Sequence, residues 1–443
     1  MRQPILHRDQ VKQTQANRPA PAVGLLPRLW LEHAPHSVLQ GIALRTKSTV
    51  ISMFTSITAP CLFVPHCFTE PWWPARAAAQ DHFAAVLHVL LRACAWLAED
   101  KWAHIHVERF RELVPKNVVA AILDTLVAQS VILRDERYAP GFRSMGYRLS
   151  EALLRRVPLT AIYEPKGAAL KKKVTTYWEQ RAASDLDLPA DYLVQAQVIR
   201  ENISLRELCA RNTAVAAERP LLASLAVCEI LAGRVRFNKD QFGRFHTSVT
   251  NLKREIRRDC MVLDGSDTQE LDVSNCQPLL LARLMWQDNV PEAQFSAWLT
   301  ACESGELVTL LAKAMNDRHN GSVKYSREQV KKQLIVWLFD AGKLPYLEVA
   351  DVISELFPAV AAYVDGERHQ LEGKRLCDRL QRLEASLVIP TVAELIRQGV
   401  PCCSVHDSVI CRVGEEARVR KALEASFVDV GLQPQLKAKG MAA

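Results

Sequence analysis

The sequence contains no apolar run long enough to cross a membrane, because polar or charged side chains interrupt every stretch of about 20 residues. Residues 1–23 lack the apolar core of a secretory signal, so we expect a flexible leader and a cytoplasmic protein that does not bind a membrane. No Cys-x-x-Cys pair occurs among the 12 cysteines, which argues against a zinc site and predicts reduced thiols. No internal repeat of fixed period is visible.

The bulk composition is that of a globular protein with a small excess of positive charge. The 443 residues suffice for about two or three domains, and 49% of them are hydrophobic. Lys and Arg outnumber Asp and Glu by 56 to 49, which gives a net charge of +7. This excess is compatible with a nucleic-acid partner but does not require one.

The N-terminal part predicts an irregular segment followed by a small helical domain. Eight prolines between Pro19 and Pro74 prevent long helices, so residues 1–75 are expected to be irregular. Three helical patterns and two strand patterns follow, at 80–97, 107–114, 116–129, 131–134 and 146–149. This order resembles a winged-helix domain over residues 76–150, which would contact duplex DNA through its third helix and wing. A packing domain with a solvated basic hairpin is the alternative.

Two aspartates interrupt strand patterns in the C-terminal half. Leu271 leads into Asp272, and an apolar run follows, which predicts a strand, a turn and a helix. His406 and Asp407 interrupt an alternating apolar pattern, which predicts a hairpin with Asp407 at its tip. Two carboxylates brought close together are typical ligands of two Mg²⁺ or Mn²⁺ ions in phosphoryl transfer.

Residues 327–339 have the spacing of one helix between these aspartates. Arg327 and Lys331 share a face of it, and Phe339 lies two turns beyond the lysine. Such a face can hold a triphosphate and its base.

Four motifs in this order resemble those of family A DNA polymerases and phage-type single-subunit RNA polymerases. They are Asp240-Gln241-Phe242-Gly243-Arg244, Asp272-x-Ser274-x-x-Gln277, Arg327-x-x-x-Lys331 with Phe339, and His406-Asp407. Together the four are far more specific than any one of them. The resemblance implies an α+β right-hand fold, with palm and fingers in residues 239–443 and a helical thumb-like region in residues 151–238.

The resemblance also implies roles for individual residues. Asp272 and Asp407 would bind the two metal ions and act in catalysis with Lys331. The incoming nucleoside triphosphate would contact Arg327, Lys331, Phe339 and Gln277. The DNA template-primer would contact Arg244, His406 and Gln381, the last at a position where the family often keeps a minor-groove-reading glutamine.

Several residues depart from the family pattern. Phe339 stands where tyrosine is usual, and Asp340 follows where glycine is usual. Gln277 replaces a glutamate of the DNA enzymes that excludes a 2′-hydroxyl, whereas Ser408 matches the RNA enzymes. The choice between deoxyribose and ribose is therefore open at this point. No Asp-x-Glu triplet precedes Asp272, which predicts that a proofreading exonuclease is absent.

These observations predict a monomeric, template-directed nucleotidyltransferase, with DNA synthesis favoured by the spacing from Asp272 to Gln277. RNA or primer synthesis by the same superfamily is one alternative. A replication initiator that binds DNA without catalysis is the other.

Overall fold

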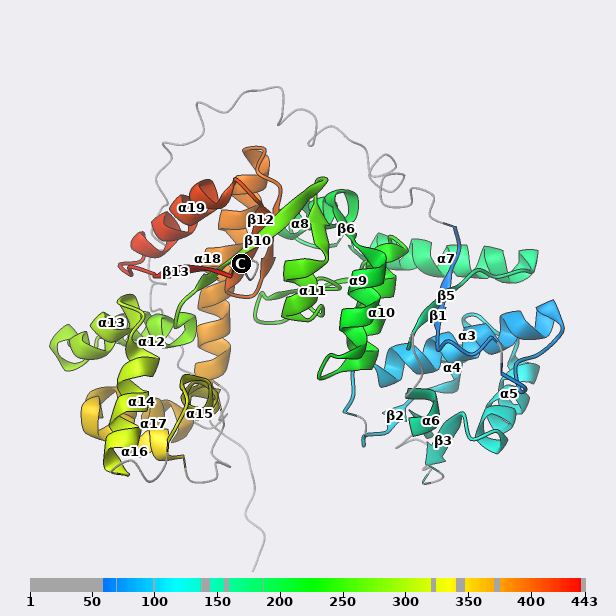
Figure 1. The fold of residues 1–443 in the computed structure, drawn as a ribbon, viewed down its shortest axis with the longest axis horizontal. Helices are drawn as coiled ribbons and strands as arrows, with labels where there is room; N and C mark the ends of the chain where they lie inside the picture. Colours follow the sequence, from blue (N-terminus) through cyan, green and yellow to red (C-terminus); the bar gives the residue numbers. More distant parts are fainter. Residues whose placement is uncertain are drawn as a thin grey trace, which may run out of the picture. The chain divides into compact units, whose positions relative to one another are not determined.

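The computed structural model describes residues 59–68, 70–98, 100–135, 137, 144–154, 159–185, 187–319, 324–339, 347–369 and 375–439. The chain divides into two units, residues 1–50 and 51–443, and every described residue belongs to the second. Helices and strands of this unit form a mixed α and β fold, as the sequence predicts (Figure 1). None of the described helices is both long and apolar enough to cross a membrane. Most of the predicted irregular segment, residues 1–58, lies outside the described residues.

The N-terminal part of the described unit is built around helix α3. Its elements are β1 (Leu62–Val64), α3 (Ala77–Cys94), β2 (Ala103–His104), α4 (Val107–Arg111), α5 (Lys116–Ala128), β3 (Ile132–Asp135), β4 (Gly146–Leu149), α6 (Glu151–Leu154), β5 (Ala161–Tyr163) and α7 (Ala168–Asp185). The apolar face of α3, with Leu87, Leu90 and Leu91, is buried in a core shared with α5 and α7. The three helices and two strands predicted between residues 80 and 149 are present, with slightly different ends.

Strand β2 was not predicted, and it pairs with β4 to make a three-stranded antiparallel sheet of order β2-β4-β3. The hairpin from β3 to β4 was expected to be basic through Arg134, Arg137, Arg143 and Arg148. Arg143 lies outside the described residues, and the other three have partners. Arg134 forms an ion pair with Asp124 at 2.6 Å, and Arg137 forms one with Asp135 at 2.9 Å. Arg148 lies over a tryptophan ring. Much of the expected positive charge of this hairpin is therefore neutralised or shielded.

The middle of the chain joins the N-terminal core to a larger sheet. Its elements are α8 (Ala190–Asn202), β6 (Ile203–Leu205), α9 (Glu207–Val215), α10 (Pro220–Leu231), β7 (Phe237–Lys239), β8 (Phe245–Thr247), α11 (Arg254–Asp259) and β9 (Met261–Leu263). Helix α10 contributes buried side chains to the N-terminal core and to the core under α8 and α9. Strand β6 pairs with β9 in the larger sheet. The residues predicted as a thumb are thus packed partly onto that sheet.

The C-terminal part completes the sheet and covers it with helices. Its elements are β10 (Ser266–Val273), α12 (Cys276–Gln287), η2 (Glu292–Gln294), α13 (Ser296–Glu303), α14 (Leu307–Arg318), α15 (Arg327–Phe339), α16 (Glu348–Leu356), α17 (Pro358–His369), α18 (Arg375–Arg397), β11 (Cys402–Val405), β12 (Ser408–Arg412), α19 (Glu416–Val428) and β13 (Leu436–Lys439). Helix α17 was not predicted. Helix α18 continues through Pro390, although a proline inside a helix often kinks or ends it.

Strand β10 is the centre of the antiparallel sheet. The strand order is β11-β12-β10-β9-β6, and β13 also pairs with β10. Strand β12 lies along one edge of β10, and β9 and β13 share the other edge, β9 near the start of β10 and β13 near its end. Asp264 and Gly265 make the tight turn from β9 to β10, and both have positive φ. From the sequence, residues 437–443 would be expected to form a loose tail, but residues 437–439 pair with β10.

The sheet has an apolar core on each face. Along β12, Val409 belongs to one core and the adjacent Ile410 to the other. Leu271 and Val273 of β10 face the same core as Val409. Because side chains alternate along a strand, Asp272 projects from the opposite face of the sheet. The long helix α18 packs against α8, α12 and α19, and against β11.

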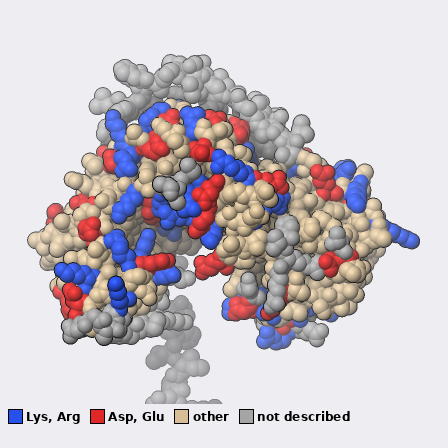
Figure 2. Space-filling model, viewed as in Figure 1, with Lys and Arg blue, Asp and Glu red and all other residues tan. Residues whose placement is uncertain are grey.

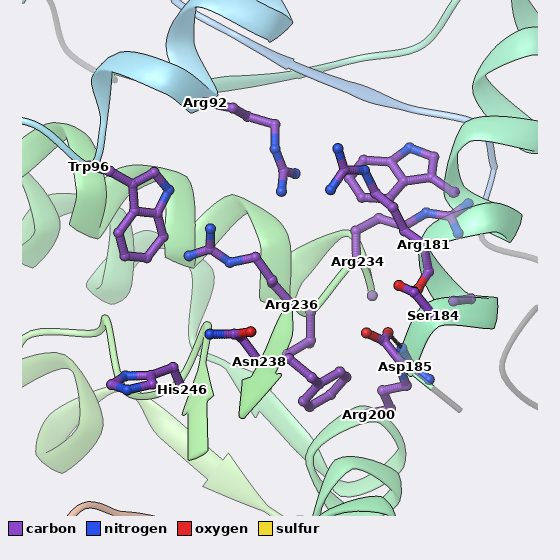
Figure 3. Close-up of a pocket in the computed structure, with 15 residues that line it drawn as sticks. Arg92, Trp96, Arg181, Ser184, Asp185, Arg200, Arg234, Arg236, Asn238 and His246 are labelled. Carbon is purple, nitrogen blue, oxygen red and sulfur yellow. Dashed lines mark hydrogen bonds and ion pairs between the residues drawn. The ribbon is translucent and has the colours of Figure 1, made fainter. Parts of the chain in front are cut away.

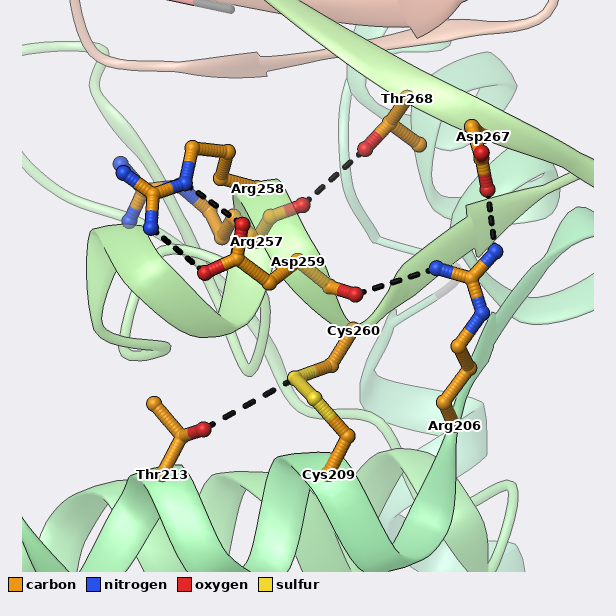
Figure 4. The surroundings of a disulfide bond; sticks show 9 residues. All are labelled: Arg206, Cys209, Thr213, Arg257, Arg258, Asp259, Cys260, Asp267 and Thr268. Atoms are coloured by element: carbon orange, nitrogen blue, oxygen red, sulfur yellow. Dashed lines mark hydrogen bonds and ion pairs between the residues drawn. A yellow bond between two sulfur atoms is a disulfide. The ribbon is translucent and has the colours of Figure 1, made fainter. Parts of the chain in front are cut away.

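One disulfide links helix α9 to the end of α11. Cys209 and Cys260 form the bond, with Cα atoms 5.8 Å apart (Figure 4). The prediction that all cysteines are reduced is wrong for this pair, whose members are 51 residues apart in the sequence. The other ten cysteines form no disulfide, and most of them are buried.

Candidate functional site

The sheet brings the two predicted metal-binding aspartates together. Asp272 lies near the end of β10, opposite Ser408 of β12 in the antiparallel ladder. Asp407 is the residue before Ser408, in the turn between β11 and β12, where His406 has a positive φ of 57°. The Val273 N–H donates to the Asp407 carbonyl oxygen at 3.3 Å. The predicted hairpin and the proximity of its aspartate to Asp272 are confirmed.

The two carboxyl groups influence each other electrostatically. Burial, together with repulsion from Asp272 and Glu384, raises the pKa of Asp407 to about 7, although Lys439 opposes the shift. The Ser408 hydroxyl donates to Asp272 Oδ1 at 2.6 Å. Near neutral pH the pair therefore favours one proton or a cation.

Lys439 of β13 already supplies one positive charge to this pair. Its ammonium group donates to Asp272 Oδ1 at 2.6 Å and to Glu270 Oε1 at 3.1 Å. Arg257 also pairs with Glu270, at 3.1 Å. Figure 2 shows Lys and Arg side chains gathered near the end of the described chain at β13. The sequence analysis missed Lys439, because it treated this segment as a tail.

The D-x-x-G-R segment forms a tight loop between β7 and β8. Asp240 Oδ1 accepts hydrogen bonds from the N–H groups of Phe242 and Arg244, each at 2.9 Å. Gly243 has a φ of 86°, and a Cβ added there would lie 3.3 Å from the Ala385 Cβ on α18. Both observations require glycine at this position. Asp240 and Gly243 of the motif thus fix the loop against α18.

The loop places Arg244 beside a buried glutamate that was not predicted from the sequence. Arg244 Nε donates to Glu384 Oε1 at 2.9 Å, and its Nη2 donates to Oε2 at 2.8 Å. Glu384 lies on α18 with 1% of its surface exposed. The Gln277 side-chain amide of α12 also donates to Glu384. Helix α12, the D-x-x-G-R loop and α18 therefore meet at one carboxylate.

His406 lies beside the same loop. Its ring is 5.6 Å from the ring of His246, which contacts Asp240 Oδ2 at 2.9 Å. Burial and the nearby positive charge of Arg244 lower the pKa of His406 to about 4, so the imidazole is neutral at pH 7. The His406 Nδ1 is buried and has no hydrogen-bond partner among the described residues.

Helix α15 presents the predicted triphosphate-binding cations to solvent. Arg327 and Lys331 are exposed, and Phe339 is partly buried against the core. The Arg327 guanidinium donates to the hydroxyl of Thr309 on α14. Helix α15 packs against α18. Within the described residues, no hydrogen bond or ion pair connects Arg327 or Lys331 to the two aspartates.

Gln381 lies on α18, three residues before Glu384. Its amide contacts the Cys377 Sγ at 3.0 Å, one turn earlier on the helix. Asp272, Asp407, Arg244, His406 and Gln277 therefore belong to one connected region. Gln381 borders this region, and the α15 residues stand apart from it.

Little in the sequence indicated that Glu384 and Lys439 belong to the site. Glu384 occurs in a helix rich in charged residues, where burial of a single carboxylate cannot be recognised without its partner. For Lys439, the alternation of Leu436 and Ala438 with Lys437 and Lys439 was the available strand signal.

No protein-family model matches the chain, and the search of curated proteins finds no match. Among the described residues, no cluster of three or more His, Cys, Asp or Glu side chains has the arrangement of a metal site. The candidate site therefore rests on the aspartate pair and its surroundings.

Proposed function

We propose that this chain is a template-directed nucleotidyltransferase that extends a DNA primer and lacks proofreading. One observation carries the proposal: Asp272 and Asp407, far apart in the sequence, lie next to each other on β10 and the β11–β12 turn. The same region holds the arginine of the D-x-x-G-R motif. In this proposal β10 to β12 are the palm of a right-hand fold, α15 belongs to the fingers, and residues 76–150 are a winged-helix-like domain.

The donor set fits magnesium. Asp272 and Asp407 offer hard carboxylate oxygens, and Mg²⁺ is usually bound by one or two carboxylates with substrate phosphates. The raised pKa of Asp407 also favours a cation, because a positive charge relieves the repulsion between the carboxylates. When bound, Mg²⁺ or Mn²⁺ would lower the pKa of the attacking 3′-hydroxyl and neutralise charge on the leaving pyrophosphate.

The remaining residues would hold the reactants. Arg327 and Lys331 would bind the triphosphate, and Phe339 would lie near its base. Arg244, fixed by Glu384, would contact the template-primer close to the neutral imidazole of His406. Catalysis would then depend on positioning and electrostatic stabilisation, as is usual for phosphoryl transfer.

One observation favours a second candidate, a DNA-binding initiator without catalysis. The Lys439 ammonium is hydrogen-bonded to the same Asp272 carboxylate that would bind metal. A lysine that permanently neutralises Asp272 would suit a palm that only binds DNA.

Primer extension separates the two candidates. The full chain is supplied with a labelled primer-template, Mg²⁺, and either dNTPs or NTPs. Asp272→Asn and Asp407→Asn are each expected to reduce extension at least about a hundredfold. Asp267→Asn is the matched control, because it removes a charge from the same strand outside the site. The preferred nucleotide pool decides between DNA and RNA synthesis.

Each of the other results has a definite meaning. Extension that survives both aspartate substitutions would refute the proposed role of the pair. No extension by the unsubstituted chain, with duplex binding that neither substitution changes, would favour the initiator.

A further inference from the structure

A cavity of about 420 Å³ lies between α3, α7 and the β7–β8 hairpin, and neither Asp272 nor Asp407 lines it (Figure 3). Its lining includes His246, whose ring lies 5.6 Å from that of His406. Its lining is rich in guanidinium groups, contributed by Arg92, Arg181, Arg200, Arg234 and Arg236. Trp96, Trp178 and Phe237 supply aromatic surface. Its volume lies within the range of small-ligand sites, which are roughly 300–1,000 Å³.

Among the described residues that line this cavity, arginines outnumber carboxylates. Arg92 pairs with Glu229 at 3.3 Å, and Arg200 pairs with Asp185. The guanidinium groups of Arg181 and Arg236 have no ion-pair partner among the described residues, and the buried Nε of Arg181 has no hydrogen-bond partner there.

The charge imbalance is also visible in the ionisation of Arg236. Burial, opposed by Glu229 and reinforced by repulsion from Arg92 and Arg181, lowers the pKa of Arg236 to about 10. Guanidinium groups that repel one another in a partly buried space destabilise the ligand-free protein. An anion in the cavity would remove that repulsion.

The arrangement of the side chains suits a phosphate next to an aromatic base. Figure 3 shows the guanidinium groups of Arg92 and Arg236 directed into the same space beside Trp96. The Arg236 guanidinium lies 3.7 Å from the centre of the Trp96 ring. Planar guanidinium groups match the oxygen geometry of phosphate, and tryptophan rings stack with bases.

We propose that this cavity is a second binding site, which takes a phosphate-bearing nucleotide unit. Arg92, Arg181 and Arg236 would hold the phosphate, and Trp96 would border the base. The unit could be a free nucleotide or the 5′-phosphorylated end of a strand, since both present the same chemistry. The site requires no metal ion and does not depend on catalysis at Asp272.

Binding is measured by calorimetry on the full chain in EDTA, so that any metal-dependent binding at the aspartate pair is suppressed. The probes are dATP, oligothymidylate with a 5′-phosphate, the same oligonucleotide with a 5′-hydroxyl, and tripolyphosphate. We expect Arg181→Gln and Arg236→Gln each to weaken binding about tenfold or more, because each removes a charge-assisted contact. Lys421→Gln, which removes one charge from the exposed face of α19, should leave binding unchanged.

Thermal unfolding distinguishes a binding role from a structural one. If the arginines serve a ligand, Arg236→Gln keeps or raises the melting temperature of the free protein, because repulsion is relieved. The same variant then loses the stabilisation that the nucleotide gives. A lower melting temperature of the free variant would instead assign Arg236 a structural role and overturn the proposal.

The probes identify the ligand. Preference for dATP supports a free nucleotide, and preference for the 5′-phosphorylated oligonucleotide supports a strand end. The proposal fails if no nucleotide probe binds, or if both arginine variants bind as tightly as the unsubstituted chain. It also fails if tripolyphosphate binds as tightly as dATP, because the base would then contribute nothing.

Discussion

Glu384→Leu is expected to destabilise the protein by about 3–5 kcal/mol, because it removes one partner of a buried ion pair. Glu384 is 1% exposed, and 19% of the Arg244 side chain is exposed, so the arginine would keep its charge with little access to water. The Gln277 amide would lose its partner as well. This substitution tests whether the D-x-x-G-R loop is held by the glutamate.

Removing both members of the pair should cost less than removing the glutamate alone. The Arg244→Met, Glu384→Leu double variant removes both charges of this pair and leaves the Gln277 amide without its partner, at a cost of about 1–3 kcal/mol. We therefore expect the double variant to recover about 2 kcal/mol relative to Glu384→Leu. Primer extension should nevertheless stay low in the double variant, because Arg244 is proposed to contact the template-primer.

Denaturation by urea, followed by circular dichroism, measures these differences. Asp267→Ala is the control, since it breaks an exposed ion pair with Arg206 and should change stability by less than about 1 kcal/mol. A double variant that is as unstable as Glu384→Leu would refute the account of Arg244 as a charge left unpaired. Full extension activity in the double variant would refute the proposed role of Arg244 in binding the template-primer.

Three further predictions concern other parts of the fold. Gly243→Ala should destabilise the protein by about 1–3 kcal/mol, because alanine is strained at this positive φ. The midpoint of thermal unfolding measures the effect, and an unchanged midpoint would contradict the prediction. Burial and nearby Arg92 lower the pKa of His88, so the unfolded chain binds a proton below about pH 6.5 that the folded chain excludes, and the contribution of His88 to stability should fall as the pH falls from 6.5 to 5. The raised pKa of Asp407 acts in the opposite direction, so the contribution of His88 is measured as the difference in slope between the unsubstituted chain and His88→Gln. His88→Gln can still accept the Phe63 N–H and should flatten this pH dependence, whereas an equal slope would exclude His88 as its source. Reducing the Cys209–Cys260 disulfide should cost up to about 4 kcal/mol, and Cys209→Ser should then be insensitive to reductant.

The local patterns of the sequence predicted much of the candidate site. Asp272 and the Asp407 hairpin were recognisable because apolar alternation marks strands, and the proximity of the two carboxylates followed from the expectation that they act together. The pairing of β10 with β12 was not predicted. Helix α15 was predicted from its side-chain spacing for the same reason. A single sequence reveals periodic patterns of apolar residues, which repeat within about ten residues.

Contacts between distant segments were not predictable in this way. The partner of Arg244 is 140 residues further along the chain, and nothing near Glu384 distinguishes it from the exposed glutamates of other helices. The Cys209–Cys260 disulfide links segments that share no motif. The short strand β13 was missed because four residues are too few for a pattern, although its lysine pairs with Asp272.

The position of β13 has a consequence for how the protein folds. Lys439 and Asp272 are separated by 167 residues, and contacts of such long range generally form late, after more local structure has closed the distance between them. Until β13 joins the sheet, the repulsion between Asp272 and Asp407 lacks its lysine counter-charge. We therefore expect this part of the sheet to become stable late in folding.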